Sequence, residues 1–253
     1  MKLDRIYNED CLEGMKRIPD GSVDCIICDL PYGTTQNDWD SLIPLDMLWE
    51  QYHRICKPTS PIVLFSQQPF TSKLLMSNPK QFRYEWIWEK ANGTGFLNAK
   101  KMPMKAHENI LVFYERLPTY NPQMWKSTSY RRKPSGNEKL CDCYGEYKLD
   151  NVYDSDMRYP KDVVKFQQDD EFYNSNVRHW LHPTQKPVDL LRYLVLTYTN
   201  EGDTVLDNCM GSGTTAIACI KERRHFIGFE LSKEYFDKAV RRIKAEQAQL
   251  TLF

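Results

Sequence analysis

Residues 203–216 of this 253-residue chain, Asp-Thr-Val-Leu-Asp-Asn-Cys-Met-Gly-Ser-Gly-Thr-Thr-Ala, are the part of the sequence that most clearly predicts its fold. The apolar run at 203–207 predicts a buried strand, the two glycines predict a tight turn, and the residues from 214 to about 222 predict a helix. Glu230 ends the next predicted strand, where an acid can accept hydrogen bonds from a ribose diol. The turn therefore predicts a site for a nucleoside-bearing cofactor, although a tight turn without a ligand has the same local pattern.

The alternation of strand and helix continues outward through both ends of the chain. Strands that alternate with helices indicate a mostly parallel sheet with helices on both faces, that is, an α/β fold. The further predicted strands are 23–28, 61–65, 84–88, 109–114 and 225–229, and the further helices are 45–56, 69–77, 188–198 and a last one capped by Ser232.

The composition excludes several classes of protein. The chain balances 34 Lys and Arg against 34 Asp and Glu, and 41% of its residues are hydrophobic, which is typical of a globular chain with a true core. Its longest apolar runs fall far short of the ~18 residues that a membrane span needs. Residues 1–5 lack the apolar stretch of a secretory signal. We therefore expect a cytoplasmic protein that does not enter a membrane.

The eight cysteines do not form a metal-binding pattern. Cys25 and Cys28 stand three apart on a predicted strand, so their side chains point to opposite faces and cannot share a metal there. Cys141 and Cys143 are separated by one residue, and no nearby His or Cys pair completes four ligands. We expect reduced thiols and no metal site.

Two short segments join the glycine turn as candidate sites. Asp29-Leu30-Pro31-Tyr32 follows the strand at 23–28, and ligands of open α/β sheets bind beyond the carboxyl ends of the strands. A carboxylate, a rigid proline turn and an aromatic ring would therefore meet in one cleft. The segment 182–187, His-Pro-Thr-Gln-Lys-Pro, precedes the helix at 188–198, where its lysine can meet a carboxylate. Taken singly, neither segment excludes an ordinary loop.

The middle of the chain is irregular and basic. Residues 117–182 are rich in Pro, Asn, Ser, Tyr and charge and have no sustained period, which is typical of an inserted recognition surface. Basic residues gather at 90–106 and 126–139, and such segments are either solvated loops or contacts to nucleic-acid phosphates. The candidate contacts are Lys90, Lys100, Lys101, Lys105, Arg131, Arg132 and Lys133.

Together the candidate segments resemble the amino-methylating DNA methyltransferases that use S-adenosylmethionine. Asp29-Leu30-Pro31-Tyr32 resembles the D-P-P-Y catalytic tetrad of that family, with Leu30 in place of the first proline. Met210-Gly211-Ser212-Gly213 resembles its F-x-G-x-G cofactor loop, with Met210 where a phenylalanine is usual. The order, with the tetrad first and the cofactor loop last, resembles the circularly permuted beta group. Further matches are 8–11 (Asn-Glu-Asp-Cys), 107–111 (His-Glu-Asn-Ile-Leu) and 182–187.

The resemblance implies a Rossmann-like, circularly permuted methyltransferase fold in three parts. Residues 1–116 would form the catalytic half, 117–181 a variable DNA-recognition region and 182–253 the cofactor-binding half. The implied reaction moves a methyl group from S-adenosylmethionine to the exocyclic amine of a base flipped out of double-stranded DNA. Because the tetrad begins with Asp29, adenine N6 is favoured over cytosine N4. A homodimer and a cognate restriction endonuclease are the partners that the group suggests.

The resemblance also assigns roles to single residues. The Asp29 carboxylate and the Leu30 carbonyl would accept the two hydrogens of the amine, and Tyr32, after Pro31, would stack on the base. Asp10 and Cys11 would meet the adenine of the cofactor, and Glu230 would meet its ribose. The lysine and threonine of 182–187 would lie near its carboxylate. The cofactor residues are thus Asp10, Cys11, Thr184, Lys186, Asp207, Met210, Gly211, Ser212, Gly213, Thr214 and Glu230.

Other functions share part of this pattern. A nicotinamide-dependent oxidoreductase would explain the glycine turn and Glu230, but neither the tetrad nor the basic middle. A cytosine carbon-5 methyltransferase needs a cysteine after a proline, and the sequence has no Pro-Cys pair. RNA and protein-glutamine methyltransferases have an N-P-P-Y tetrad, whereas this one begins with Asp29. An inactive DNA-binding protein with the same fold is the last alternative, which the intact residues Asp29, Pro31, Tyr32, Gly211 and Gly213 disfavour.

Overall fold

The structure is a computed structural model that describes residues 1–33, 42–127, 156–166 and 185–250. The chain forms two compact units, Met1–Asn121 with Asp162–Phe253, and Pro122–Lys161. The second unit contains β6 (Trp125–Lys126) and β7 (Met157–Arg158), which pair antiparallel. The first unit contains the central sheet, its helices and all the described candidate site residues.

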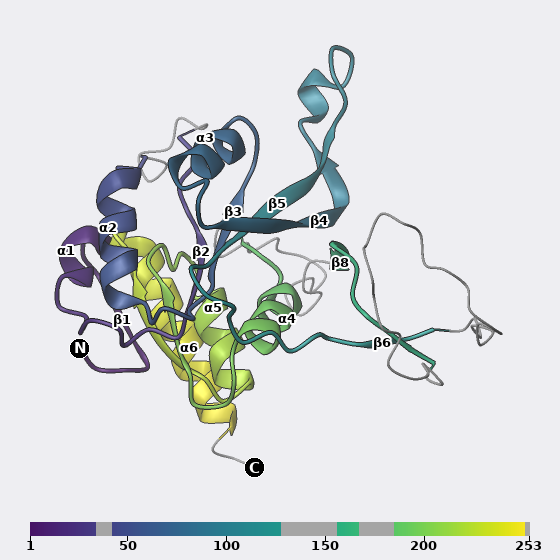
Figure 1. The fold of residues 1–253 in the computed structure, drawn as a ribbon. Helices are drawn as coiled ribbons and strands as arrows, with labels where there is room; N and C mark the ends of the chain where they lie inside the picture. The colour runs from purple at the N-terminus through teal and green to yellow at the C-terminus, as the bar shows by residue number, and fades with distance from the viewer. Residues whose placement is uncertain (34–41, 128–155, 167–184, 251–253) are drawn as a thin grey trace. The chain divides into compact units, whose positions relative to one another are not determined.

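The sheet of the first unit has the strand order β1-β10-β9-β2-β3-β5-β4-β8 (Figure 1). Neighbouring strands pair in parallel except at β5, which runs antiparallel to β3 and β4. The predicted mostly parallel sheet is therefore confirmed. Its strands are β1 (Arg5–Tyr7), β2 (Cys25–Asp29), β3 (Ile62–Ser66), β4 (Phe82–Thr94), β5 (Lys105–Phe113), β8 (Val163–Phe166), β9 (Thr204–Asp207) and β10 (His225–Phe229).

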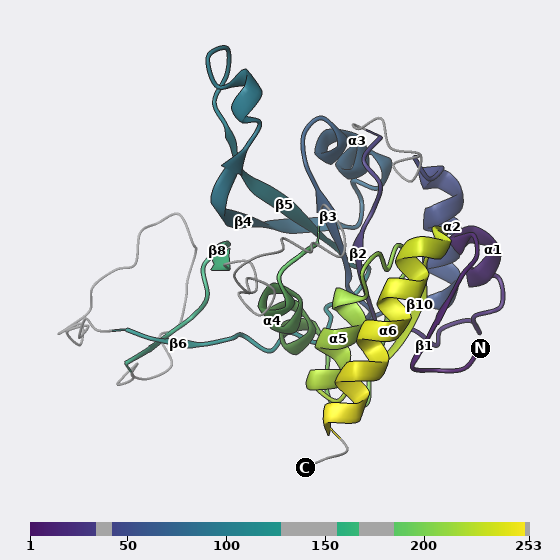
Figure 2. The ribbon, with the colours of Figure 1, turned by 180° about the vertical axis from the view of Figure 1, so that it is seen from behind.

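Helices cover both faces of this sheet, as the alternation of elements predicts (Figures 1 and 2). Cys25 and Ile27 of β2 pack into a core with α4 (Val188–Tyr198), α5 (Thr214–Lys221) and α6 (Lys233–Leu250). Ile26 and Cys28 pack into a second core with α1 (Cys11–Met15), α2 (Leu45–Ile55) and α3 (Phe70–Ser77). Each large aliphatic side chain buried in these cores contributes about 1.5–3 kcal/mol. The opposite directions of Cys25 and Cys28 are confirmed.

The structure differs from the sequence-based prediction in the short and half-buried elements. β1 has three residues and α1 has five, and both are too short to show a period. The prediction that 117–182 is irregular is wrong at β8, which pairs with β4 at the edge of the sheet. Residues of β8 are alternately exposed and half-buried, so its apolar signal is weak.

The strand predicted at 84–88 is also longer than expected. β4 continues to Thr94 and forms with β5 a hairpin that extends beyond the rest of the sheet (Figure 1). Its tip is a 3-10 turn at Phe96–Asn98, where Phe96 is 77% exposed and Leu97 is 97% exposed. Within the described part of the chain, no helix is both long and apolar enough to cross a membrane.

Candidate active site

Four acids meet at one edge of the sheet. Asp29 ends β2 and Asp207 ends β9, while Glu230 directly follows β10, and these strands are parallel neighbours. Glu108 lies near the start of β5, which runs the other way and so begins at the same edge. The carboxyl edge therefore collects the acids of segments that are far apart in the sequence, as expected for the ligand site of an open α/β sheet.

Backbone amides hold the Glu230 carboxylate. The Gly211 N–H donates to Oε2 and the Ser232 N–H donates to Oε1, both at 2.8 Å. Gly211 has φ +54°, a left-handed conformation that favours glycine and that turns its N–H toward the acid. Burial raises the pKa of Glu230, and the two amides oppose that rise. Among the described residues Glu230 has no ion pair, so the carboxylate is fixed in place without a cation.

Asp207 braces the start of the same loop. Its Oδ1 accepts the Cys209 N–H at 3.0 Å, and its Oδ2 accepts the Thr215 hydroxyl at 2.6 Å. Burial raises the pKa of Asp207 to about 6, against the effect of these hydrogen bonds. Both carboxylate oxygens of Asp207 therefore accept hydrogen bonds, and they hold the turn between β9 and α5 together.

The other predicted loop residues lie on or under this turn. Met210 is buried, and its side chain fills the space above Gly228 that a Cβ would need. Gly213, at φ +84°, lies where a Cβ would come within 3.2 Å of Ala239 on α6, so glycine lets the helix approach. Ser212 and Thr214 contact Arg242 of the same helix, which donates to the Ser212 carbonyl at 3.3 Å and to Thr214 Oγ1 at 3.0 Å. The loop is thus locked onto α6.

Asp10 and Cys11 lie at the start of α1. The Asp10 carboxylate caps this helix by accepting the N–H groups of Leu12 at 2.8 Å and Glu13 at 3.1 Å. Cys11 is buried in the core beneath. Asn8, just before them, donates to the Glu230 carbonyl at 2.8 Å, and so the turn after β1 is tied to the turn after β10.

The tetrad lies directly beyond β2. The Tyr32 hydroxyl donates to Asp29 Oδ1 at 2.7 Å. The Tyr32 ring stacks on Phe70 of α3, with centroids 5.4 Å apart and planes 25° apart. Leu30 is 3% exposed, so its side chain is a core residue and leaves only its backbone for the site. Phe70, which sequence reasoning did not single out, thus sets the place of the tyrosine.

Lys186 binds the Asp29 carboxylate. Its Nζ lies 2.5 Å from Asp29 Oδ2 and 3.2 Å from Glu108 Oε2, although Lys186 and Asp29 are 157 residues apart. Lys90 of β4 pairs with the other oxygen of Glu108. Burial would lower the pKa of Lys186, but the two acids raise it well above its ordinary value. Burial raises the pKa of Asp29, which Lys186 opposes, while Lys186 and Lys90 outweigh burial and lower that of Glu108.

We call these four residues, Lys90, Glu108, Lys186 and Asp29, the charge chain. Sequence reasoning named three of its members but not their contacts. Glu108 carried a signal, since it belongs to the matching segment 107–111, but nothing local shows that it faces two lysines. Lys186 was assigned to the cofactor carboxylate, and the structure places its ammonium on two acids of the protein.

The predicted DNA-binding residues fall in three places. Lys90 is largely buried in the charge chain, with a side chain 17% exposed. Lys100 and Lys101 follow the tip of the β4–β5 hairpin and Lys105 begins β5, and all three are exposed. Arg131, Arg132 and Lys133 lie outside the described residues, as does the predicted cofactor residue Thr184.

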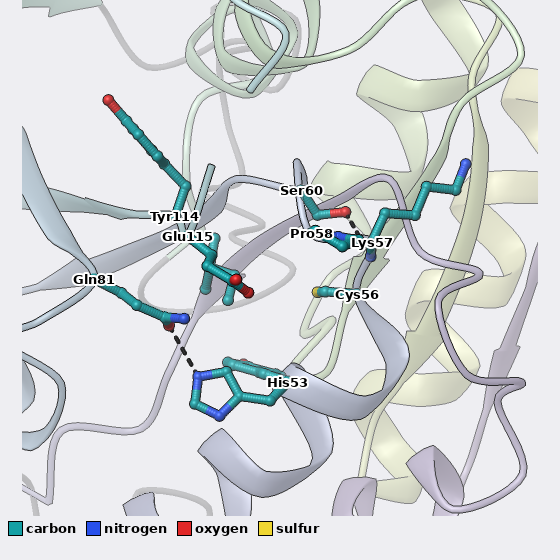
Figure 3. A pocket seen from close by; sticks show the side chains of 10 residues that line it. His53, Cys56, Lys57, Pro58, Ser60, Gln81, Tyr114 and Glu115 are labelled. Atoms are coloured by element: carbon teal, nitrogen blue, oxygen red, sulfur yellow. Dashed lines mark hydrogen bonds between the residues drawn. The ribbon is translucent and has the colours of Figure 1, made fainter. Parts of the chain in front are cut away.

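A separate pocket of about 330 Å³ lies near the amino end of β3, away from the acids (Figure 3). His53 turns toward Gln81 there, with 2.9 Å between His53 Nε2 and Gln81 Oε1. Ser60 accepts the Lys57 N–H at 3.0 Å and donates to the Val23 carbonyl at 2.7 Å. His53 and Gln81 contact each other and Ser60 binds backbone groups, so we place the reaction at the carboxyl edge, where the four acids meet. No group of three or more metal-ligating side chains occurs among the described residues.

Comparison with known proteins identifies the family. The N6/N4 DNA methylase family profile matches residues 23–241, which include the tetrad, the charge chain and the cofactor loop. The chain belongs to the DNA methylase family. The prediction of a DNA amino-methyltransferase is therefore confirmed, and with it the Rossmann-like methyltransferase fold.

The proteins that this DNA methylase resembles are named for different target bases. It is 29% identical to the DNA adenine methyltransferase YhdJ of Escherichia coli, over 94% of this chain and 82% of that one. It is 28% identical to the type II methyltransferase M.BglII of Bacillus subtilis, over 96% and 70%. The crystal structure of the M1.HpyAVI–SAM complex matches with a TM-score of 0.62 and 26% identity, over 94% and 98%. The cytosine-N4-specific PvuII DNA methyltransferase, 14% identical with a TM-score of 0.67 over 96% and 91%, shares the fold.

Proposed function

We propose that this DNA methylase is a site-specific enzyme that transfers a methyl group from S-adenosylmethionine to the N6 amine of adenine in double-stranded DNA. The observation that carries the proposal is the placement of Asp29 and Tyr32 at the same sheet edge as the Gly211–Glu230 loop. An acceptor for an amine and a site for a ribose thus lie on parallel strands of one sheet. The Asp at the head of the tetrad and the 29% identity to an adenine methyltransferase favour adenine.

The chemistry follows from the weakness of the nucleophile. The lone pair of an exocyclic amine is delocalised into the ring. Two acceptors, the Asp29 carboxylate and the Leu30 carbonyl, would hold the two amine hydrogens and favour a pyramidal nitrogen with a localised lone pair. Asp29 would also stabilise the positive charge that develops on that nitrogen. Fixing the two reactants in line can contribute roughly 7–11 kcal/mol at best.

The residues around Glu230 suit S-adenosylmethionine. A buried carboxylate without a cation can accept the hydrogens of a ribose diol, and its two amide donors keep it aimed. Beside Gly211 a Cβ would meet nothing closer than 4.0 Å, so the backbone is open to a ligand there. Glu230, Gly211 and the Asp10–Cys11 turn would hold the nucleoside. When bound, the cofactor supplies an electrophilic sulfonium methyl group.

The DNA contacts are proposed for the exposed lysines of the hairpin. Lys100, Lys101 and Lys105 lie on a segment without acids that extends from the sheet, which suits the phosphate backbone. Phe96 and Leu97 add an exposed apolar tip. Tyr32, held by Phe70, would stack on the flipped base. A homodimer, a cognate restriction endonuclease and a cytoplasmic location stay predictions.

Methyl transfer from labelled S-adenosylmethionine to unmethylated genomic DNA, followed by nucleoside analysis, tests the proposal. We expect N6-methyladenine from the wild type and none from Asp29→Ala. N4-methylcytosine would correct the base and keep the mechanism. No methylated base, despite measured cofactor binding, would contradict a DNA substrate and favour RNA or protein.

A matched control is Glu201→Gln. Glu201 is an acid in the turn before β9, at the opposite end of that strand from Asp207, and its side chain is 68% exposed. This variant should methylate DNA like the wild type. A similar loss in Glu201→Gln and Asp29→Ala would show that the assay reports folding and not the site.

A further inference from the structure

Both oxygens of the proposed catalytic carboxylate already have donors. The Tyr32 hydroxyl occupies Asp29 Oδ1 and the Lys186 ammonium occupies Oδ2. An amine that enters the site needs an acceptor on this carboxylate. Because an ammonium is a stronger donor than an aromatic amine, Lys186 competes with the substrate for the oxygen that the reaction uses. A carboxylate oxygen can accept a second hydrogen bond, but an ammonium on Oδ2 offsets the negative charge with which Asp29 would stabilise the amine nitrogen. The proposed reaction is therefore favoured if this ammonium moves to another acceptor.

Glu108 offers that place. Its Oε2 is buried and accepts no hydrogen bond from any residue that the structure describes, although Lys186 Nζ lies only 3.2 Å away. A buried carboxylate oxygen without a hydrogen bond is costly, even where an ion pair offsets part of that cost. The cost would be removed if the ammonium turned from Asp29 to Glu108.

Neighbouring strands hold Glu108 ready for the ammonium. Glu108 pairs with Trp88 in the β4–β5 ladder, and Trp88 lies two positions before Lys90 on β4. The Lys90 ammonium fixes the other carboxylate oxygen, Oε1, and lies 5.5 Å from the centroid of the Trp88 ring. Oε2 is thereby left pointing to Lys186. The acceptor sits on a paired strand and the donor at the end of a flexible side chain, so the lysine is the part that moves.

The Lys186 ammonium can move without leaving a favourable environment. It lies 5.2 Å from the centroid of the Phe65 ring, at the end of β3 between β2 and β5. An aromatic face attracts a cation without fixing its direction. The charge chain also contains two acids and two bases, so a shift of one ammonium between two carboxylates changes no net charge in the buried site.

We propose that Glu108 is a positioning residue that draws the Lys186 ammonium off Asp29 when the target amine binds, so that Asp29 becomes free to accept the amine. In this account Lys186 stabilises the empty site and Glu108 releases it. The inference rests on the proposed function, because it needs an amine at Asp29. Glu108 itself does not touch the reacting atoms.

The test is a double-mutant cycle on Glu108→Gln and Lys186→Gln, measured as methyl-transfer rate at saturating cofactor. Glu108→Gln keeps the shape but removes the charge that attracts the lysine, so we expect a loss of roughly 100-fold, the size expected for misplaced reacting groups. In the Lys186→Gln background, adding Glu108→Gln should change the rate by less than threefold. The double variant should therefore be about as fast as Lys186→Gln alone.

A merely structural role for Glu108 predicts a different cycle. If Glu108 only braces the fold, its substitution should cost the same factor with or without Lys186. A full loss in the Lys186→Gln background would overturn the proposal. Glu108→Asp keeps the charge on a shorter side chain and should therefore be faster than Glu108→Gln. If Glu108 only filled space, the Asp variant would not be faster than the Gln variant.

A measurement on the lysine itself covers the case of a poorly folded double variant. In protein labelled with ¹³C at lysine Cε, the Lys186 signal is assigned by its absence in Lys186→Gln. We expect it to shift when S-adenosylhomocysteine is bound and duplex DNA with the methylated site is then added. The shift should be absent in Glu108→Gln. An unchanged signal in the wild type upon DNA addition would contradict the movement.

The outcomes separate this proposal from the proposed function. A wild type that methylates no DNA base would remove the proposed function and with it the role of Glu108. A wild type that methylates DNA while Glu108→Gln is equally fast would remove the role of Glu108 alone. Cofactor affinity, measured by calorimetry, should stay within a few-fold in Glu108→Gln, which shows that its defect is not one of cofactor binding.

Discussion

Asp29 and Glu230 are both carboxylates beyond parallel strands of one sheet, but the protein holds them by opposite means. Glu230 receives two backbone N–H groups and has no ion pair among the described residues. Asp29 receives a tyrosine hydroxyl and a lysine ammonium. Backbone donors of a locked turn cannot leave, whereas side-chain donors can rotate away. The comparison indicates that the cofactor side is a fixed frame and the target side a set of exchangeable contacts.

The largest effect on methyl transfer is expected from Asp29→Asn. Asn keeps the shape but loses the charge that stabilises the developing cation, so we expect methyl transfer to fall by about 10³-fold. Because the amide-bound frame is untouched, cofactor affinity should change by less than a few-fold. Single-turnover rates and calorimetry measure the two quantities. An equal loss of cofactor binding would show that the two carboxylates share one role.

Asp207 provides a third acid at the same edge, braced by one amide and one hydroxyl. Burial raises its pKa from 3.8 to about 6. The folded protein therefore binds a proton on Asp207 more tightly than the unfolded chain does, and this difference stabilises the fold. The stabilisation is complete below about pH 3.8 and is lost as pH rises through about 6. Such a shift corresponds to about 3 kcal/mol. We expect the free energy of unfolding of Asp207→Asn, relative to the wild type, to rise between pH 4 and 6 and then level off.

Chemical denaturation at a series of pH values measures this difference. Thr59→Ala, at an exposed position without a titratable group, is the control and should show no such rise over the same range. If the difference in unfolding free energy between Asp207→Asn and the wild type does not change with pH, the hydrogen bonds of Asp207 to Cys209 and Thr215 offset the rise in its pKa that burial causes.

Glu230→Gln should have the opposite effect to Asp29→Asn and weaken cofactor binding more than the methyl-transfer rate. Gln retains one acceptor oxygen but loses a charge-assisted hydrogen bond, which is worth about 1.5–3 kcal/mol, so cofactor affinity should fall by roughly 10- to 100-fold. At saturating cofactor the rate should recover to near the wild-type value, because Asp29 and its partners are unchanged. A rate that stays low at saturation would place Glu230 in the chemical step.

The smallest effect is expected outside both carboxylates, at the hairpin. Lys100→Ala combined with Lys101→Ala should weaken DNA binding several-fold and reduce the slope of log affinity against log salt by about 2, since each phosphate contact contributes about 0.9. Fluorescence anisotropy at several salt concentrations measures it. Lys2→Ala with Lys80→Ala, at two other exposed positions, is the matched control. An unchanged slope in the hairpin variant would remove these lysines from the DNA interface.

Much of the frame could be predicted from the sequence because it is local. The buried strands at β2, β3, β9 and β10 are short apolar runs, and the glycines of 211 and 213 need left-handed backbone. β1 and α1 could not be predicted, because elements of three and five residues show no period. β8 could not be predicted because half of its residues stay exposed. Met210 departs from the usual phenylalanine, and only the structure shows that it fills the space over Gly228.

The sequence was enough to predict the family, the order of the two site halves and the residues Asp29, Tyr32, Gly211 and Glu230, since each belongs to a short motif beside a predicted strand. The folded structure was needed to show that Lys186 lies on Asp29 and Glu108, and that Lys90 is buried beside them. The physical reason is that these contacts join β2, β4, β5 and the turn before α4, where pairing across the sheet, not spacing along the chain, sets which charges meet.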